Sequence, residues 1–227
     1  MSDTIEISGL CKSFSVEGRT LEVLKNLNLS VPANEITVLL GRSGCGKTTL
    51  LDMIRARGGL ILDCDAIYHE LLQTDQVMLD AIEARFPGTV DNGALQRKKL
   101  GAIVFADPAA LLDLNRITHA AVKQEVLKRL EAAPVLAAID AIGLFEGDLA
   151  VLCDVTVAVT APVELRVQRL MKRDGISEEY ARSRIAAQHD DAWFRQHCDY
   201  VLENSDTIDA FATKCLAFFR HIGIIEA

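Results

Sequence analysis

The sequence predicts an α/β fold in which helices cover both faces of a mostly parallel sheet. Short, continuous apolar runs alternate with segments of helical periodicity, the pattern of parallel strands that are buried on both faces. The chain has 227 residues, half of them hydrophobic and a quarter charged, which is enough for one sizeable core. The first apolar run also ends at a glycine-rich turn that opens a helical segment.

Five apolar runs are expected to form the sheet. They are EITVLL (35–40), LILD (60–63), VLAAID (135–140), VTVAVT (155–160) and YVLE (200–203). We expect the strand at 60–63 to lie next to the strand at 35–40. Helices are predicted at residues 48–57, 66–72, 77–86, 95–105, 108–130, 162–172 and 208–221, and a further helix begins at Ser177. Proline is tolerated in a first helical turn, as at Pro162, and serine is a favoured N-cap.

The first 34 residues follow a different pattern. TIEISGL (4–10) and LEVLKNLNLSV (21–31) alternate apolar and polar positions, as half-exposed antiparallel strands do, and VEGRT (16–20) is the turn between them. We therefore predict a β-hairpin appendage at residues 1–34 and a main domain at residues 35–227.

Charge and composition exclude several classes of protein. The net charge of −8 argues against a nucleic-acid or lipid-surface partner, because such proteins usually carry a basic face. We see no apolar run of the ~20 residues that a spanning helix needs and no signal peptide. The six cysteines form no CxxC pair, so we expect reduced thiols in a cytoplasmic protein. The cluster of His189, Asp190, Asp191, His197 and Cys198 fits no standard zinc spacing, and we favour a solvated helix end.

The glycine-rich turn matches the phosphate-binding motif G-x-x-x-x-G-K-[ST] in full, from Gly41 to Thr48. Its amides should wrap the phosphates of ATP, Lys47 should reach the β- and γ-phosphates, and the Thr48 hydroxyl should bind Mg²⁺. The alternative is a strand-to-helix turn with a chance lysine. The nucleotide-binding residues are predicted to be Gly41, Gly44, Cys45, Gly46, Lys47, Thr48 and Thr49. Cys45 is either a reactive thiol or, as we prefer, a small residue that fills the loop.

Residues 4–51 resemble the start of an ABC-transporter ATPase, in the stretches ISGLCKSF and LKNLNLSVPANEITVLLGRSGCGKTTLL. In that family the aromatic residue at the position of Phe14 stacks on adenine, whereas a core residue of the hairpin is an equal alternative. Beyond Gly58 the resemblance stops. We find no glutamine loop, LSGGQ-type signature or switch histidine, and Ala141 follows Asp140 where the catalytic glutamate would stand.

From about residue 41 onward the chain resembles dephospho-CoA kinase. The matching stretches are ILDCDAIYHEL (61–71), ALQRKKLGAIVFADPAALLDLNRITHAAV (94–122), AIDAIGLFE (138–146), VTVAVTAPVELRVQRLMKRDGISEEYARSRIAAQ (155–188) and CDYVLENSDT (198–207). The resemblance implies a P-loop NTPase fold with a helical lid at about residues 162–190. It also implies ATP-dependent phosphorylation of the ribose 3′-hydroxyl of dephospho-CoA. We infer an ABC-like N-terminus joined to a kinase body.

The resemblance also assigns catalytic roles. Asp65 matches the carboxylate that acts as general base, and Arg169 matches the lid arginine that closes over the transferred phosphate, with Arg173 a weaker candidate. Asp63 either supports Mg²⁺ or, as we prefer, caps the next helix. Asp140 ends a strand beside the P-loop and could hold Mg²⁺ through water.

The remaining assignments concern binding. Arg97, His119 and Glu146 stand at positions that line the acceptor pocket in the family, and Asn204 stands where the family contacts the adenine of ATP. Structural roles are the alternatives for His119 and Asn204. The chain departs from the family at Ala120, where proline is usual, and at Ile142–Gly143. Both departures are on the acceptor side, so we expect them to change acceptor affinity more than nucleotide binding.

Three functions stay open at this point: a dephospho-CoA kinase, an ATP-binding fragment of an ABC transporter, and a nucleotide-binding remnant without turnover. The missing ABC signature weighs against the second. The sequence does not specify the oligomeric state.

Overall fold

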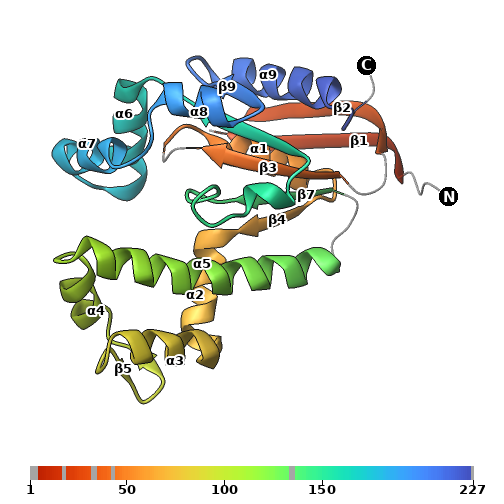
Figure 1. The fold of residues 1–227 in the computed structure, drawn as a ribbon. Coiled ribbons are helices and arrows are strands. Elements are labelled where there is room, and N and C mark those ends of the chain that lie inside the picture. The colour runs from red at the N-terminus through yellow and green to blue at the C-terminus, as the bar shows by residue number, and fades with distance from the viewer. Residues whose placement is uncertain (1–4, 17–18, 32–34, 42–43, 133–135, 226–227) are drawn as a thin grey trace. The chain divides into compact units, whose positions relative to one another are not determined.

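The computed structural model describes residues 5–16, 19–31, 35–41, 44–132 and 136–225, with side chains from residue 44 onward (Figure 1). It divides into two compact units. The first comprises Met1–Ile61, Ala133–Ala138 and Cys153–Ala227, and the second comprises Leu62–Ala132 and Ile139–Leu152. The predicted boundary at residue 34, between the appendage and the main domain, does not coincide with the division into these two units and stays a prediction.

The five predicted strands form one sheet. They are β3 (Glu35–Gly41), β4 (Leu60–Asp63), β7 (Leu136–Asp140), β8 (Val155–Thr160) and β9 (Tyr200–Glu203), in the order β4-β7-β3-β8-β9. The β3–β8 and β8–β9 pairs are parallel, as predicted. The prediction that β4 lies next to β3 is wrong, because β7 lies between these two strands. β7 is apolar and buried from Leu136 to Ile139, which suits a strand with neighbours on both sides.

The helices of the first unit are α1 (Lys47–Arg55), α6 (Val163–Asp174), α7 (Glu178–Ala186), α8 (Asp191–His197) and α9 (Ile208–His221). Its main core joins apolar residues of α1, the strands and α9, among them Leu50, Ile54, Val157, Val159 and Phe219. Burial of such side chains contributes about 1.5–3 kcal/mol each. The predicted N-cap Ser177 is confirmed, since its hydroxyl accepts a hydrogen bond from the Tyr180 amide at 3.2 Å.

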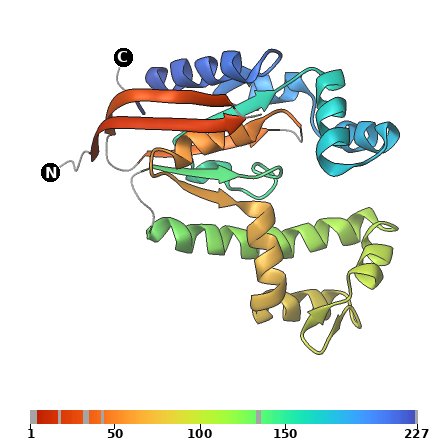
Figure 2. The same cartoon turned by 180° about the vertical axis from the view of Figure 1, so that it is seen from behind.

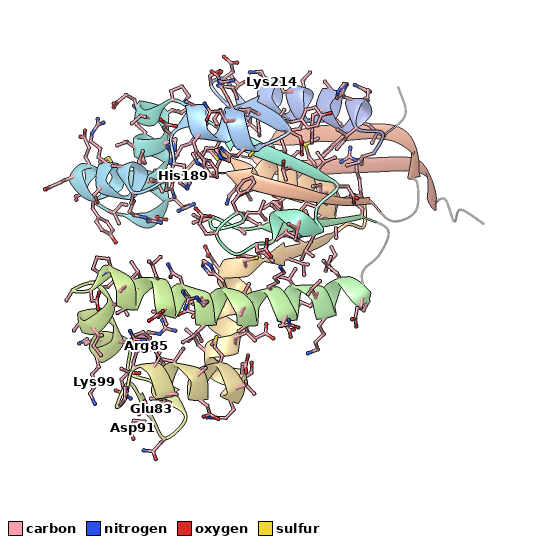
Figure 3. The ribbon with its side chains drawn as sticks, viewed as in Figure 1. Glu83, Arg85, Asp91, Lys99, His189 and Lys214 are labelled. Atoms are coloured by element: carbon pink, nitrogen blue, oxygen red, sulfur yellow. The ribbon has the colours of Figure 1, made fainter. Side chains whose placement is uncertain are left out.

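The second unit contains α2 (Cys64–Thr74), α3 (Gln76–Arg85), α4 (Arg97–Val104), α5 (Pro108–Glu131), the short strands β5 (Val90–Asp91) and β6 (Ala94–Leu95), and a 3₁₀ turn at Ala150–Leu152. The α4 helix is shorter than the predicted 95–105 because β6 pairs with β5. Asn92 and Gly93 make the turn of this hairpin with φ values of 49° and 74°. The Glu83 carboxylate accepts the amides of Gly88 and Val90 and so fixes the hairpin to α3 (Figure 3).

The N-terminal strands β1 (Ile5–Val16) and β2 (Arg19–Val31) pair antiparallel and form a separate two-stranded sheet (Figures 1 and 2). The predicted hairpin is therefore confirmed. The side chain of Phe14 lies outside the part of the chain whose side chains are described, so both interpretations of it stay open.

The α8 helix was not predicted. Trp193 on this helix stacks between His189 and His197, with ring centroids 3.9 Å apart on each side. Across the described residues no group of three or more His, Cys, Asp or Glu side chains could hold a metal ion. Within the same residues no helix is long and apolar enough to cross a membrane.

Candidate active site

The described part of the phosphate loop takes a form that only glycine permits at two positions. Gly44 and Gly46 have φ values of 81° and 97°, in the left-handed region that other residues rarely adopt. A Cβ on Gly44 would lie 3.0 Å from the Arg166 carbonyl oxygen, and one on Gly46 would lie 2.2 Å from Nδ2 of Asn204. Gly41 ends β3, and residues 42–43 of the motif lie outside the described residues.

The loop opens directly into a helix. α1 begins at Lys47, so Lys47, Thr48 and Thr49 form its first turn, where free amides and the helix dipole favour an anion. The Thr48 side chain is exposed. The Cys45 side chain is fully buried in the core, which supports its interpretation as a filling residue.

Two polar side chains hold the outer side of the loop. Asn204, 5% exposed, donates from Nδ2 to the Cys45 carbonyl oxygen at 2.8 Å. Arg169 donates to the carbonyl oxygens of Gly44 and Cys45, both at 3.3 Å, and to Oδ1 of Asn204 at 3.4 Å. The predicted lid arginine therefore contacts the phosphate loop. A contact of Asn204 with adenine stays a prediction.

The arginines of α6 have different environments. Arg166 is fully buried and donates to Oε1 of Gln188 at 2.8 Å, whereas Arg173 is exposed and pairs with Asp174 at 2.6 Å. Arg184 on α7 also contacts Asp174, at 2.8 Å. Hydrogen bonds from Arg173 and then Arg184 lower the pKa of Asp174 to about 2. The Arg184–Asp174 pair joins α7 to the last residue of α6 across the turn at Gly175.

The second unit contains a pocket of about 250 Å³. Its walls come from α2, α5 and the loop after β7, and they comprise Cys64, Asp65, Tyr68, Leu114, Asn115, Thr118, His119, Val122, Ala141, Ile142, Gly143, Gly147 and Leu149. The predicted Asp65 and His119 are both in this wall. Ile142 and Gly143, where the chain departs from the family pattern, also line it.

The polar groups of the pocket have distinct environments. Nδ1 of His119 lies 3.2 Å from the Glu146 carbonyl oxygen, which can only accept, so Nδ1 is the donor of this bond. In the neutral ring Nε2 is then an acceptor. Burial raises the pKa of Tyr68, and the nearby charge of Arg97 opposes that shift. The predicted Arg97 and Glu146 thus act on pocket residues, although neither is among the lining side chains.

Among the lining residues that the sequence analysis did not predict, three have a hydroxyl or carboxamide side chain: Tyr68, Asn115 and Thr118. Their spacing carried a signal. Asp65 and Tyr68 are three positions apart on α2, and Asn115, Thr118 and His119 share one face of α5. Among the described residues, the side chains of Asp65, Tyr68 and Asn115 have no hydrogen-bond partner, and all three line this pocket.

The other predicted carboxylates have separate positions. Asp63 is the N-cap of α2 and accepts the Ala66 amide at 3.0 Å, which confirms the preferred interpretation. Asp140 ends β7, as predicted. The hydroxyl of Thr48 and the carboxylate of Asp140 are hard oxygen donors of the kind that Mg²⁺ binds together with water and phosphate, so the residue types fit the predicted metal.

Comparisons with known proteins agree with these features. A sequence model of one family, described as dephospho-CoA kinase, matches residues 36–210. The chain is 36% identical over 191 residues to the dephospho-CoA kinase of Deinococcus radiodurans, a match that covers 82% of this chain and 91% of that protein. It is 38% identical over 182 residues to that of Anaeromyxobacter dehalogenans, covering 78% and 86%.

Solved structures agree as well. A crystal structure from Thermus thermophilus superposes with a TM-score of 0.70 at 29% identity, covering 84% of this chain and 98% of that one. Dephospho-CoA kinase from Campylobacter jejuni superposes with a TM-score of 0.58 at 23% identity, covering 83% and 96%, which bears on the fold alone. The predicted P-loop kinase fold is confirmed. The resemblance of residues 4–51 to an ABC ATPase stays a prediction. The chain belongs to the dephospho-CoA kinase family.

Proposed function

We propose that the chain transfers the γ-phosphoryl group of ATP to the ribose 3′-hydroxyl of dephospho-CoA, giving coenzyme A and ADP. The observation that carries the proposal is the position of Asp65 in the wall of a pocket beside a phenol, a carboxamide and an imidazole. Its carboxylate has no hydrogen-bond partner within the described part of the chain. A carboxylate within hydrogen-bond reach of an alcohol is the group that this chemistry needs.

In this proposal the phosphate loop binds the phosphates of ATP, and Asp65 of the pocket acts on the acceptor hydroxyl. Asp65 accepts the proton of the 3′-hydroxyl as the new oxygen–phosphorus bond forms and the bond between the β–γ bridging oxygen and the γ-phosphorus breaks. Lys47 and the amides of the loop hold the β- and γ-phosphates, and Arg169 stabilises the charge that spreads over the transferred group. We assign Mg²⁺ binding to Thr48 and, through water, to Asp140. The ion would neutralise further phosphate charge.

The residues of the pocket bind the acceptor. Tyr68, Asn115 and Nε2 of His119 offer three hydrogen-bond donors and several acceptors, a set that suits a ribose or an adenine edge. Arg97 supplies the positive charge near Tyr68. Glu146 positions His119 through its carbonyl oxygen.

Two further assignments belong to the proposal. We retain an ABC-like origin for the N-terminal hairpin, supported by its separate sheet and by the start of the family match at residue 36. We also retain a cytoplasmic location, supported by the absence of a CxxC pair among the six cysteines of the sequence.

The test is ATP turnover with and without dephospho-CoA, with the product identified by mass spectrometry and Lys47→Ala as the inactive control. Acceptor-dependent formation of coenzyme A supports the proposal. Hydrolysis of ATP that ignores the acceptor would favour the transporter-like alternative, and ATP binding without turnover would favour the remnant.

A further inference from the structure

We infer that Asn204 is a positioning residue of the phosphate loop, and that it aims the loop's amides at the phosphates by holding the Cys45 carbonyl from behind. The inference deepens the proposed function and rests on that part of it which assigns ATP to the loop. It gives Asn204 a role other than contact with adenine.

The first step concerns the geometry of one peptide unit. The carbonyl of Cys45 and the amide of Gly46 belong to the same planar peptide, so they point in opposite directions. Asn204 Nδ2 holds the Cys45 carbonyl oxygen at 2.8 Å. The Gly46 amide is therefore turned to the other side of the loop. In a loop of this class that inner side is where successive amides meet the phosphate.

The second step concerns the rigidity of Asn204 itself. Its backbone amide donates to the Thr160 carbonyl oxygen at 2.8 Å, at the end of the neighbouring strand β8. Lys214 on α9 donates to the Glu203 carbonyl oxygen at 3.0 Å and to the Asp206 carboxylate at 3.3 Å, so it binds the chain on both sides of Asn204 (Figure 3). A side chain that is 5% exposed and fixed in this way can set the position of a partner.

The third step separates Asn204 from Arg169. Both donate to the Cys45 carbonyl, but Asn204 does so at 2.8 Å and Arg169 at 3.3 Å. Hydrogen bonds weaken at the longer distance, so at the Cys45 carbonyl the bond from Asn204 is the stronger of the two. We assign the lasting support of the loop to Asn204.

The fourth step explains why Asn204 can come so close. A Cβ at position 46 would lie 2.2 Å from its Nδ2, so the carboxamide fits against the loop because residue 46 has no side chain. Asn204 thus occupies the space that the second glycine of the motif leaves open on the outer side of the loop.

The experiment measures binding of inorganic tripolyphosphate, which has no adenine, and of ATP, by calorimetry on the full chain. The variants are Asn204→Asp, which keeps the shape but removes the donor, and Asn204→Ala, which adds no charge. A role through the loop predicts that both ligands weaken by the same factor, about fivefold or more for a lost hydrogen bond. The KM for dephospho-CoA should stay unchanged. Ser205→Ala, an exposed neighbour in the same segment, is the control and should change neither affinity.

The outcomes are distinct. If ATP weakens while tripolyphosphate binds as it does to the unmodified chain, Asn204 contacts adenine and the inference is wrong. Unchanged affinity for both ligands overturns it as well. A chain whose tripolyphosphate binding depends on Asn204 but which phosphorylates no dephospho-CoA would contradict the proposed function and leave this inference standing.

A measurement on the unmodified protein covers the case in which the variants do not fold. Exchange of the Asn204 side-chain amide protons, followed by NMR, should be slow both with and without tripolyphosphate, because the bond to Cys45 persists. Exchange as fast as that of the exposed Asn92 amide would overturn the inference.

Discussion

Nδ1 of His119 donates to the carbonyl oxygen of Glu146 at 3.2 Å, and this bond fixes which imidazole nitrogen is left for the acceptor pocket. Replacing His119 should therefore affect the acceptor and spare ATP. We expect His119→Ala to raise the KM for dephospho-CoA about tenfold, the effect of losing one or two hydrogen bonds, without changing the KM for ATP. Steady-state kinetics with each substrate varied in turn measures both values.

His119→Asn is the matched variant. Its amide can still donate to the Glu146 carbonyl but has no counterpart of Nε2. We expect it to raise the acceptor KM as the alanine variant does. Full recovery in the asparagine variant would mean that His119 only supports the loop after β7.

Asp65 and Asp63 provide a pair of carboxylates with separate tasks. Asp65→Asn should lower kcat by ~10²-fold or more, because a general base is lost, while ATP affinity stays the same. Asp63→Asn should change little, because asparagine is as good an N-cap for α2 as aspartate is. Single-turnover rates and ATP titrations measure the two effects. Normal turnover in Asp65→Asn would remove the assigned base.

Asp199 makes the pairing of β8 and β9 sensitive to pH. Its carboxylate accepts the hydroxyl of Thr156 at 2.6 Å and the amide of Thr156 at 2.8 Å, and these bonds lower the pKa of Asp199. A carboxyl whose pKa is lower in the folded state stabilises the fold above its unfolded pKa, about 3.9, and loses that effect as the pH falls through the folded value.

We expect Asp199→Asn to lower the urea midpoint of unfolding at pH 7, and the difference from the unmodified chain to shrink as the pH falls below about 4. Asp209→Asn is the control, since the Asp209 carboxylate has no hydrogen-bond partner among the described residues. A difference that stays constant with pH would show that charge on Asp199 does not contribute.

The N-terminal hairpin offers a test by deletion. Because β1 and β2 form a sheet of their own and the family match begins at residue 36, removal of residues 1–34 should leave kcat and both KM values unchanged. Kinetics and thermal unfolding of the shortened chain check this. Insoluble or unfolded product would mean that the hairpin covers apolar surface of the kinase body, and the appendage would have to be redefined.

Local signals predicted most of the fold. The five strands were found because each is a continuous apolar run, and Asp63 and Ser177 were recognised as caps because their side chains act within three residues. The position of β4 was not predictable in the same way. An apolar run shows that a strand is buried, but the order β4-β7-β3 depends on the path of the chain between strands.

The missed elements are too short to show a periodic pattern of apolar residues. The Asn92–Gly93 pair is a strong hairpin signal, but β5 and β6 have two residues each and show no alternation. The α8 helix has seven residues, too few for a periodic pattern, although Asp190 is a good N-cap. In the site, Asp65 and His119 were found through the family resemblance. The contact between Asn204 and Cys45 joins distant parts of the sequence, and no local pattern encodes it.

Trp193 is the single tryptophan of the chain, and imidazole rings lie against both of its faces (Figure 3 labels one of them, His189). All indole emission therefore comes from one known place, the short α8 helix between α7 and β9. The molecule thus carries its own optical reporter, and no dye or label is needed to follow this region during binding or unfolding.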